Sequence, residues 1–93
     1  MEIGGSHVVR LTEDLRQSSS PSWSRDGGRI AFVRGPYYGD ICVMNADGSQ
    51  QLNLTNDPTR SAHEPCWSPD GSWLTFTKEI GNNNSDIYTM DAQ

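Results

Sequence analysis

Short apolar stretches run along the whole chain, separated by clusters of glycine, proline, aspartate and serine. The clearest are Arg29–Arg34 (RIAFVR) and Asp40–Asn45 (DICVMN). Runs of this length between turn-forming residues predict β-strands rather than helices. Because Arg29–Arg34 is apolar without a polar alternation, we expect neighbouring layers to cover both faces of its sheet.

The pattern of strands and turns occurs twice in the chain. Pro21–Gly27 (PSWSRDG) returns as Pro65–Gly71 (PCWSPDG), 44 residues later. Other matches between the two units are offset by 43 to 46 residues, which indicates short insertions in the loops. A period of about 40–45 residues with several short strands in each unit is typical of the blades of a β-propeller.

We therefore predict an all-β chain of two four-stranded antiparallel blades, with one unit at about 1–47 and the next at about 48–93. Each blade is expected to consist of three consecutive strands and an outer fourth strand. The expected strands, in chain order, are Val8–Thr12 (outer), Ser20–Ser24, Arg29–Arg34, Asp40–Asn45, Gln51–Thr55 (outer), Glu64–Ser68, Trp73–Lys78 and Asp86–Asp91.

The repeated residues are predicted to have structural roles. In each Asp-Gly turn, at Asp26-Gly27 and Asp70-Gly71, aspartate can accept hydrogen bonds from the nearby backbone and glycine can adopt a positive φ. Trp23 and Trp67 precede these turns at equivalent positions and are expected to support the blades. We predict no catalytic role for any of these residues.

The strings P-x-W-S-P-D-G, I-A-F, D-I-Y-x-M-D-A and L-T resemble the repeat of TolB and its relatives. Similar repeats occur in the propellers of tricorn-type and prolyl-oligopeptidase-type peptidases. The resemblance covers nearly the whole chain, with departures at Arg25, Trp73 and Cys42. It implies blades of a six-bladed propeller that binds a protein or peptide without catalysis, and a periplasmic location if the resemblance extends that far.

The expected strand order leaves the second blade without an outer strand and the first outer strand without a blade. Unpaired sheet edges favour association with another chain. We expect the outer strand of one copy to complete the blade of a neighbour, so that three copies close a six-bladed ring by heterologous contacts. The alternative is that a longer parent chain closes the ring.

Ligand binding is expected on the face that carries the longer loops, which are Glu13–Ser19, Gly35–Gly39, Asn56–His63 and Glu79–Ser85. The candidate residues for binding a ligand or partner are Arg16, Tyr37, Tyr38, Arg60, His63 and Glu64. Tyrosine and arginine are common anchors of binding interfaces. The alternatives are that the tyrosines pack a loop, and that His63 and Glu64 are a solvated pair.

Composition excludes several other functions. The formal net charge is −5 with scattered basic residues, which argues against a nucleic-acid partner. No apolar run is long enough to span a membrane, and the first residues do not resemble a signal peptide. We predict neither a cofactor nor a metal, and we expect Cys42 and Cys66 to be small buried residues, with a disulfide as the alternative.

Catalysis is not expected from this chain, because it contains no G-x-S-x-G nucleophile elbow and no glycine-rich phosphate loop. Two alternatives to a binding scaffold remain. One is the substrate-admitting propeller of a serine peptidase, whose hydrolase domain would be encoded elsewhere in the parent gene. The other is a sugar-acting propeller enzyme with a metal at the channel mouth, where His63 and Glu64 would recur around a threefold axis.

Overall fold

The computed structural model describes residues 9–12, 18–35, 39–56, 60–81 and 84–92, and these residues form seven strands. Among them, no helix is long and apolar enough to cross a membrane. The strands in chain order are β1 Ser18–Trp23, β2 Arg29–Arg34, β3 Asp40–Asn45, β4 Leu52–Asn53, β5 Ala62–Trp67, β6 Trp73–Gly81 and β7 Asn84–Asp91.

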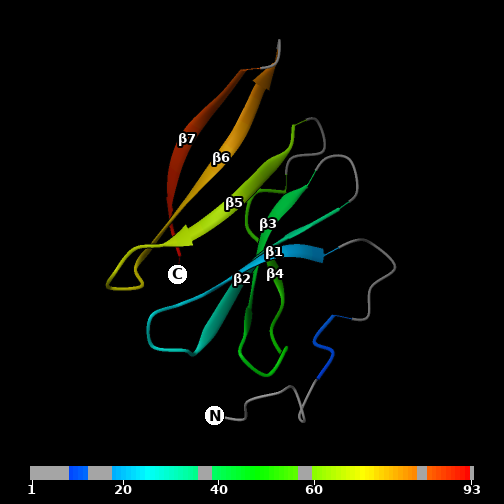
Figure 1. The fold of residues 1–93 in the computed structure, drawn as a ribbon, viewed down its shortest axis with the longest axis vertical. Coiled ribbons are helices and arrows are strands. Elements are labelled where there is room, and N and C mark those ends of the chain that lie inside the picture. Colours follow the sequence, from blue (N-terminus) through cyan, green and yellow to red (C-terminus); the bar gives the residue numbers. More distant parts are fainter. Residues whose placement is uncertain (1–8, 13–17, 36–38, 57–59, 82–83, 93) are drawn as a thin grey trace.

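The strands form two antiparallel sheets, ordered β1-β2-β3-β4 and β5-β6-β7 (Figure 1). The predicted all-β architecture with a repeated antiparallel unit is therefore confirmed. The bounds of β2 and β3 match the prediction, while β1, β5, β6 and β7 extend two or three residues further at one end. The described residues form no closed ring or barrel, so the propeller itself stays a prediction.

The two outer strands differ from the prediction. β4 contains only Leu52–Asn53, and Val9–Thr12 belongs to no strand. An outer strand needs a neighbour that supplies its hydrogen bonds, and no described strand pairs with Val9–Thr12. The predicted loop Glu79–Ser85 is also wrong, because β6 and β7 continue into it and pair Glu79 with Ser85 and Gly81 with Asn84.

The main core lies between the two sheets. Alternate residues of β2 and β3 point toward the second sheet, and its residues meet them in one buried cluster. This cluster contains Ala31, Val33, Ile41, Val43, Ala62, Trp67, Leu74, Phe76 and Ala92. On the other face of the first sheet, Ile30, Phe32, Cys42 and Met44 form a second cluster, against which Leu11 packs. Both faces of β2 are thus covered, as its apolar sequence predicts.

Burial is unequal at equivalent positions of the repeat. Trp67 faces the first sheet and is 9% exposed, whereas Trp23 is 58% exposed. The cysteines differ in the same way: Cys42 is buried and Cys66 is exposed, and they form no disulfide. The expectation that both thiols are buried is therefore wrong for Cys66. Its neighbours on the outer face of the second sheet have no described layer over them.

Each sheet has the same irregularity in its first strand. The pairing of β1 with β2 shifts between Ser19 and Ser22, and that of β5 with β6 shifts between His63 and Cys66. Within these bulges Ser20 has a φ of 53° and Glu64 a φ of 59°. A non-glycine residue in this left-handed region is strained, and its presence at equivalent positions indicates a feature of the repeat.

Candidate functional site

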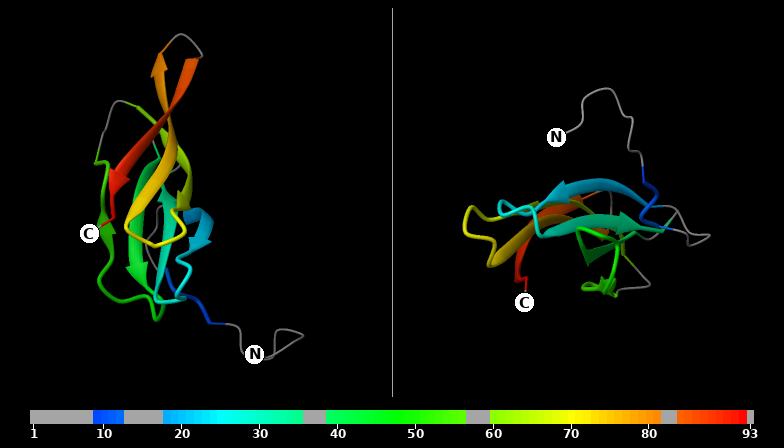
Figure 2. Two further views of the ribbon diagram at one scale, coloured as in Figure 1. Left: turned by 90° about the vertical axis from the view of Figure 1, so that its left-hand side faces the viewer. Right: turned by 90° about the horizontal axis from the view of Figure 1, so that it is seen from below.

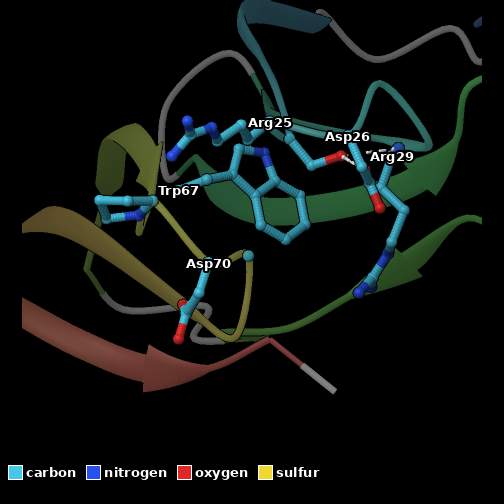
Figure 3. A pocket seen from close by; sticks show the side chains of 8 residues that line it. Arg25, Asp26, Arg29, Trp67 and Asp70 are labelled. Carbon is cyan, nitrogen blue, oxygen red and sulfur yellow. Dashed lines mark hydrogen bonds between the residues drawn. The ribbon is translucent and has the colours of Figure 1, made fainter.

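A cavity of about 600 Å³ lies between the β1–β2 turn of the first sheet and the β5–β6 turn of the second (Figure 3). Its lining residues are Ser24, Arg25, Asp26, Arg29, Trp67, Pro69, Asp70 and Gly71. The cavity thus combines both Asp-Gly turns of the repeat with one buried tryptophan. The sheet-to-sheet packing places them together, since the turns are 44 residues apart in the chain.

Trp67 forms the aromatic wall of this cavity and also joins the two sheets. Its indole Nε1 donates a hydrogen bond of 2.9 Å to the backbone oxygen of Ser22. The Arg29 guanidinium lies 5.2 Å from the centre of the Trp67 ring, and its Nη1 donates to the oxygen of Ala92 at 2.8 Å. A cation over an indole face is an attractive arrangement. Arg29 is therefore engaged in holding the sheets together.

The two aspartates at the cavity are used within their own turns. Asp26 Oδ1 accepts hydrogen bonds from Ser24 Oγ at 2.7 Å and from the Gly28 backbone N–H at 2.9 Å. Asp70 Oδ1 accepts from Ser68 Oγ at 2.7 Å and from the N–H and hydroxyl of Ser72 at 3.1 Å and 2.8 Å. The structural role predicted for both Asp-Gly turns agrees with this geometry.

Hydrogen bonds from the Ser72 backbone, the Ser68 hydroxyl and the Ser72 hydroxyl lower the pKa of Asp70 to about 2, from an ordinary 3.8. The pKa of Asp26 is lowered too, first by the Gly28 backbone N–H and then by the Ser24 hydroxyl. Both carboxylates therefore stay ionised at neutral pH. The lining of the cavity therefore contains two negative side chains, Asp26 and Asp70, and two positive ones, Arg25 and Arg29.

Because the pKa of Asp70 is lowered, we expect the stability of the folded chain to depend on pH. Since the folded pKa lies below the unfolded one, the stability that the ionised group adds is present above the unfolded pKa and is lost as the pH falls from about 3.8 through about 2. We expect the NMR titration of the Asp70 carboxyl carbon to have its midpoint near 2. Asp70→Asn should be less stable than the native chain at neutral pH, and urea unfolding should show this difference disappearing toward pH 2. A midpoint near 3.8 would contradict the role of the turn.

Arg25 is the second basic side chain that lines the cavity, beside Arg29. It lies in the exposed β1–β2 turn, and Figure 3 shows Arg25 and Arg29 on either side of the Trp67 ring. Guanidinium groups bind carboxylates through paired hydrogen bonds. The Arg25 guanidinium is therefore the carboxylate-binding group that the lining offers.

The residues predicted from the long loops lie elsewhere. His63 and Glu64 lie near the start of β5 and Arg60 precedes it, so all three are at the opposite end of that strand from the cavity. His63 Nδ1 lies 3.4 Å from Glu64 Oε1, and both side chains are substantially exposed. Arg16, Tyr37 and Tyr38 fall outside the described residues. The predicted role of this loop face in binding remains a prediction.

Sequence reasoning missed the cavity because it treated the Asp-Gly turns as tight connections only. The available signal was Arg29, six residues after Trp23, at the position where the second unit has Trp73 six residues after Trp67. Within the described residues no group of three or more histidine, cysteine, aspartate or glutamate side chains is arranged to hold a metal ion.

The sequence is similar to part of a known protein. No family model matches the sequence. The chain is 33% identical over 86 residues to a protein of Bacillus subtilis (strain 168) named "Uncharacterized peptidase YuxL". The match includes 90% of this chain but only 13% of the relative. The chain is thus homologous to a short part of a peptidase.

Proposed function

We propose that this chain is part of a non-catalytic β-propeller of a peptidase-type protein, and that the propeller holds or admits the peptide that another part of the protein cleaves. The single observation that carries the proposal is the 33% identity to a much longer peptidase. The resemblance to the propeller repeats of TolB and of two peptidase classes supports it. A binding scaffold of its own, assembled as a trimer, was the first expectation from the sequence, and it has less support.

The packing of the two sheets supports the propeller. In a propeller each blade is a twisted antiparallel sheet that packs face to face on the next one. Here one face of the first sheet packs on the second sheet through a buried apolar cluster. Hydrogen bonds from the Trp67 indole and the Arg29 guanidinium also join the two sheets. The opposite face of the first sheet is apolar at the positions equivalent to the packed face of the second sheet. Ile30 and Phe32 there correspond to Leu74 and Phe76.

A binding role fits the chemistry at hand better than a catalytic one. Cleaving a peptide bond by nucleophilic catalysis needs a nucleophile activated by a base. The sequence lacks a nucleophile elbow. The Arg25 guanidinium at the cavity instead suits the terminal carboxylate of a peptide.

Two measurements on the purified chain test this function. With fluorogenic peptides as substrate we expect no hydrolysis above the buffer rate. In NMR titrations, hexapeptides with a free C-terminal carboxylate and an apolar last residue should shift the Trp67 indole N–H signal. C-terminally amidated versions should bind roughly tenfold more weakly, since a hydrogen-bonded charge contributes about 1.5–3 kcal/mol.

Arg25→Gln provides the matching variant, and Arg60→Gln the control with the same loss of charge. We expect Arg25→Gln to remove the preference for the free carboxylate and Arg60→Gln to keep it. If the shifts instead gather around Arg60, His63 and Glu64, the peptide binds on the long-loop face and the cavity is not its site. Hydrolysis by the purified chain would reject the non-catalytic role.

A further inference from the structure

We propose that the cavity between the β1–β2 and β5–β6 turns selects peptides whose last residue is basic, with Arg25 binding the terminal carboxylate and Asp70 binding the side-chain cation. The ligand class is thus a peptide that ends in lysine or arginine. The inference rests on the proposed function, in which Arg25 binds a terminal carboxylate. It adds the residue that determines which peptide ends are preferred.

The two turns lie close together at one edge of the molecule. Figures 1 and 2 show the β1–β2 turn and the β5–β6 turn near each other. The first turn contributes Arg25 and the second contributes Asp70 to the lining of the same cavity of about 600 Å³. Pockets for small ligands have volumes of roughly 300–1,000 Å³. The cavity is therefore large enough for the last residue of a peptide.

Arg25 is not needed to form its own turn. The equivalent residue of the second unit is Pro69. Both turns nevertheless close with the same backbone hydrogen bond, which is 2.9 Å long in the first turn and 3.0 Å in the second. Arg25 is exposed and lines the cavity. Because the turn forms with either residue, the guanidinium of Arg25 is available for a ligand.

Asp70 lacks the neighbouring arginine that its equivalent has. In the first unit, the charge of Arg29 contributes to the lowered pKa of Asp26. The second unit has Trp73 at the position of Arg29, and hydrogen bonds are what lower the pKa of Asp70. Asp70 is therefore an ionised carboxylate whose own turn contains no arginine to balance its charge.

The carboxylate of Asp70 has one oxygen left for a ligand. Its Oδ1 accepts all three hydrogen bonds of the turn, which come from Ser68 and Ser72. Among the described residues, Oδ2 accepts no hydrogen bond and Asp70 forms no ion pair with Arg25. Figure 3 shows Arg25 and Asp70 on opposite sides of the Trp67 ring. A cation that enters the cavity can therefore contact Oδ2.

Opposite charges on two sides of a cavity favour a ligand end with two charges of opposite sign. A last lysine or arginine has its carboxylate and its side-chain cation on the same residue. The carboxylate suits the paired donors of Arg25, and the cation suits Asp70. A last glutamate would instead place a second carboxylate near Asp70, where like charges repel. We therefore expect basic ends to bind best, apolar ends less well and acidic ends least.

The expected preference is modest because Arg25 and Asp70 are both exposed. An exposed ion pair changes a dissociation constant by about three- to fivefold. Salt weakens such a pair, since the Debye length falls to about 3 Å at 1 M ionic strength. The preference for a basic end should therefore be clear at low salt and nearly absent at about 1 M salt.

Matched peptides test the preference on the 93-residue chain. N-acetylated hexapeptides with a free carboxylate would differ only in the last residue, which is lysine, norleucine or glutamate. Norleucine has the side-chain length of lysine without the ammonium group. NMR titrations that follow the backbone amides of the two turns should give a Kd about three- to fivefold lower for the lysine peptide than for the norleucine peptide at low salt. The glutamate peptide should bind most weakly.

Asp70→Asn tests the residue, and Asp26→Asn is the matched control in the equivalent turn. Both variants lose one negative charge and keep a side-chain oxygen for the hydrogen bonds of the turn. We expect Asp70→Asn to bind the lysine and norleucine peptides equally and Asp26→Asn to keep the preference for lysine. Loss of the preference in both variants would overturn the role of Asp70, because the total charge of the cavity would then determine it.

The outcomes separate this inference from the proposed function. Equal Kd values of the lysine and norleucine peptides for the native chain would overturn the inference while the proposed function stands, since the carboxylate would still bind. An unchanged preference in Asp70→Asn would do the same. If no peptide with a free carboxylate binds at the cavity, the proposed function fails and the inference fails with it.

Discussion

Replacing Trp67 with alanine is expected to lower the free energy of unfolding by about 3–5 kcal/mol, because a large buried aromatic side chain leaves a cavity that the surrounding core cannot fill. Trp67 is 9% exposed and lies in the cluster between the two sheets. The variant also removes the hydrogen bond to the Ser22 oxygen and the ring under the Arg29 guanidinium. Urea unfolding followed by circular dichroism measures the change.

Trp23→Ala is the matched control, since Trp23 has the equivalent position in the repeat but is 58% exposed. Its cost should be about 1 kcal/mol or less, as for most exposed sites. Equal costs for the two variants would mean that the second sheet does not pack on the first as described.

Replacing Leu74 with alanine is expected to cost about 2–5 kcal/mol, the range found for leucine in well-packed cores. Leu74 is completely buried and lies on the face of β6 that meets the first sheet. Leu52→Ala is its control, because Leu52 in β4 is 57% exposed. We expect urea unfolding to detect little change there. A small effect of Leu74→Ala would show that the two sheets unfold separately and that their shared core adds little.

The sequence predicts what depends on local pattern. The apolar runs RIAFVR and DICVMN specify β2 and β3 to the residue, because each is too short for a typical helix and is bounded by turn residues. The Asp-Gly turns follow from the hydrogen bonds that aspartate offers its own backbone. These features need no information about the neighbours of a strand.

Features that depend on neighbouring layers were not predictable in the same way. Val9–Thr12 has almost the pattern of Gln51–Thr55, yet only the latter includes a strand, since only it pairs with β3. Cys66 has an apolar neighbourhood in sequence but faces outward from the second sheet. The cavity at Trp67 is lined by two turns that are 44 residues apart in the chain. No local sequence pattern predicts that these turns lie close together.

The left-handed residue in the first strand of each sheet restricts which amino acids can stand there. Ser20 and Glu64 both hold a positive φ inside a bulge, and a branched side chain such as valine or isoleucine is poorly tolerated in that conformation. Further units of the same kind should therefore carry a small or unbranched residue, such as serine, glycine or asparagine, three positions before their tryptophan. This gives a test by which related repeats can be aligned even where the rest of the strand has diverged.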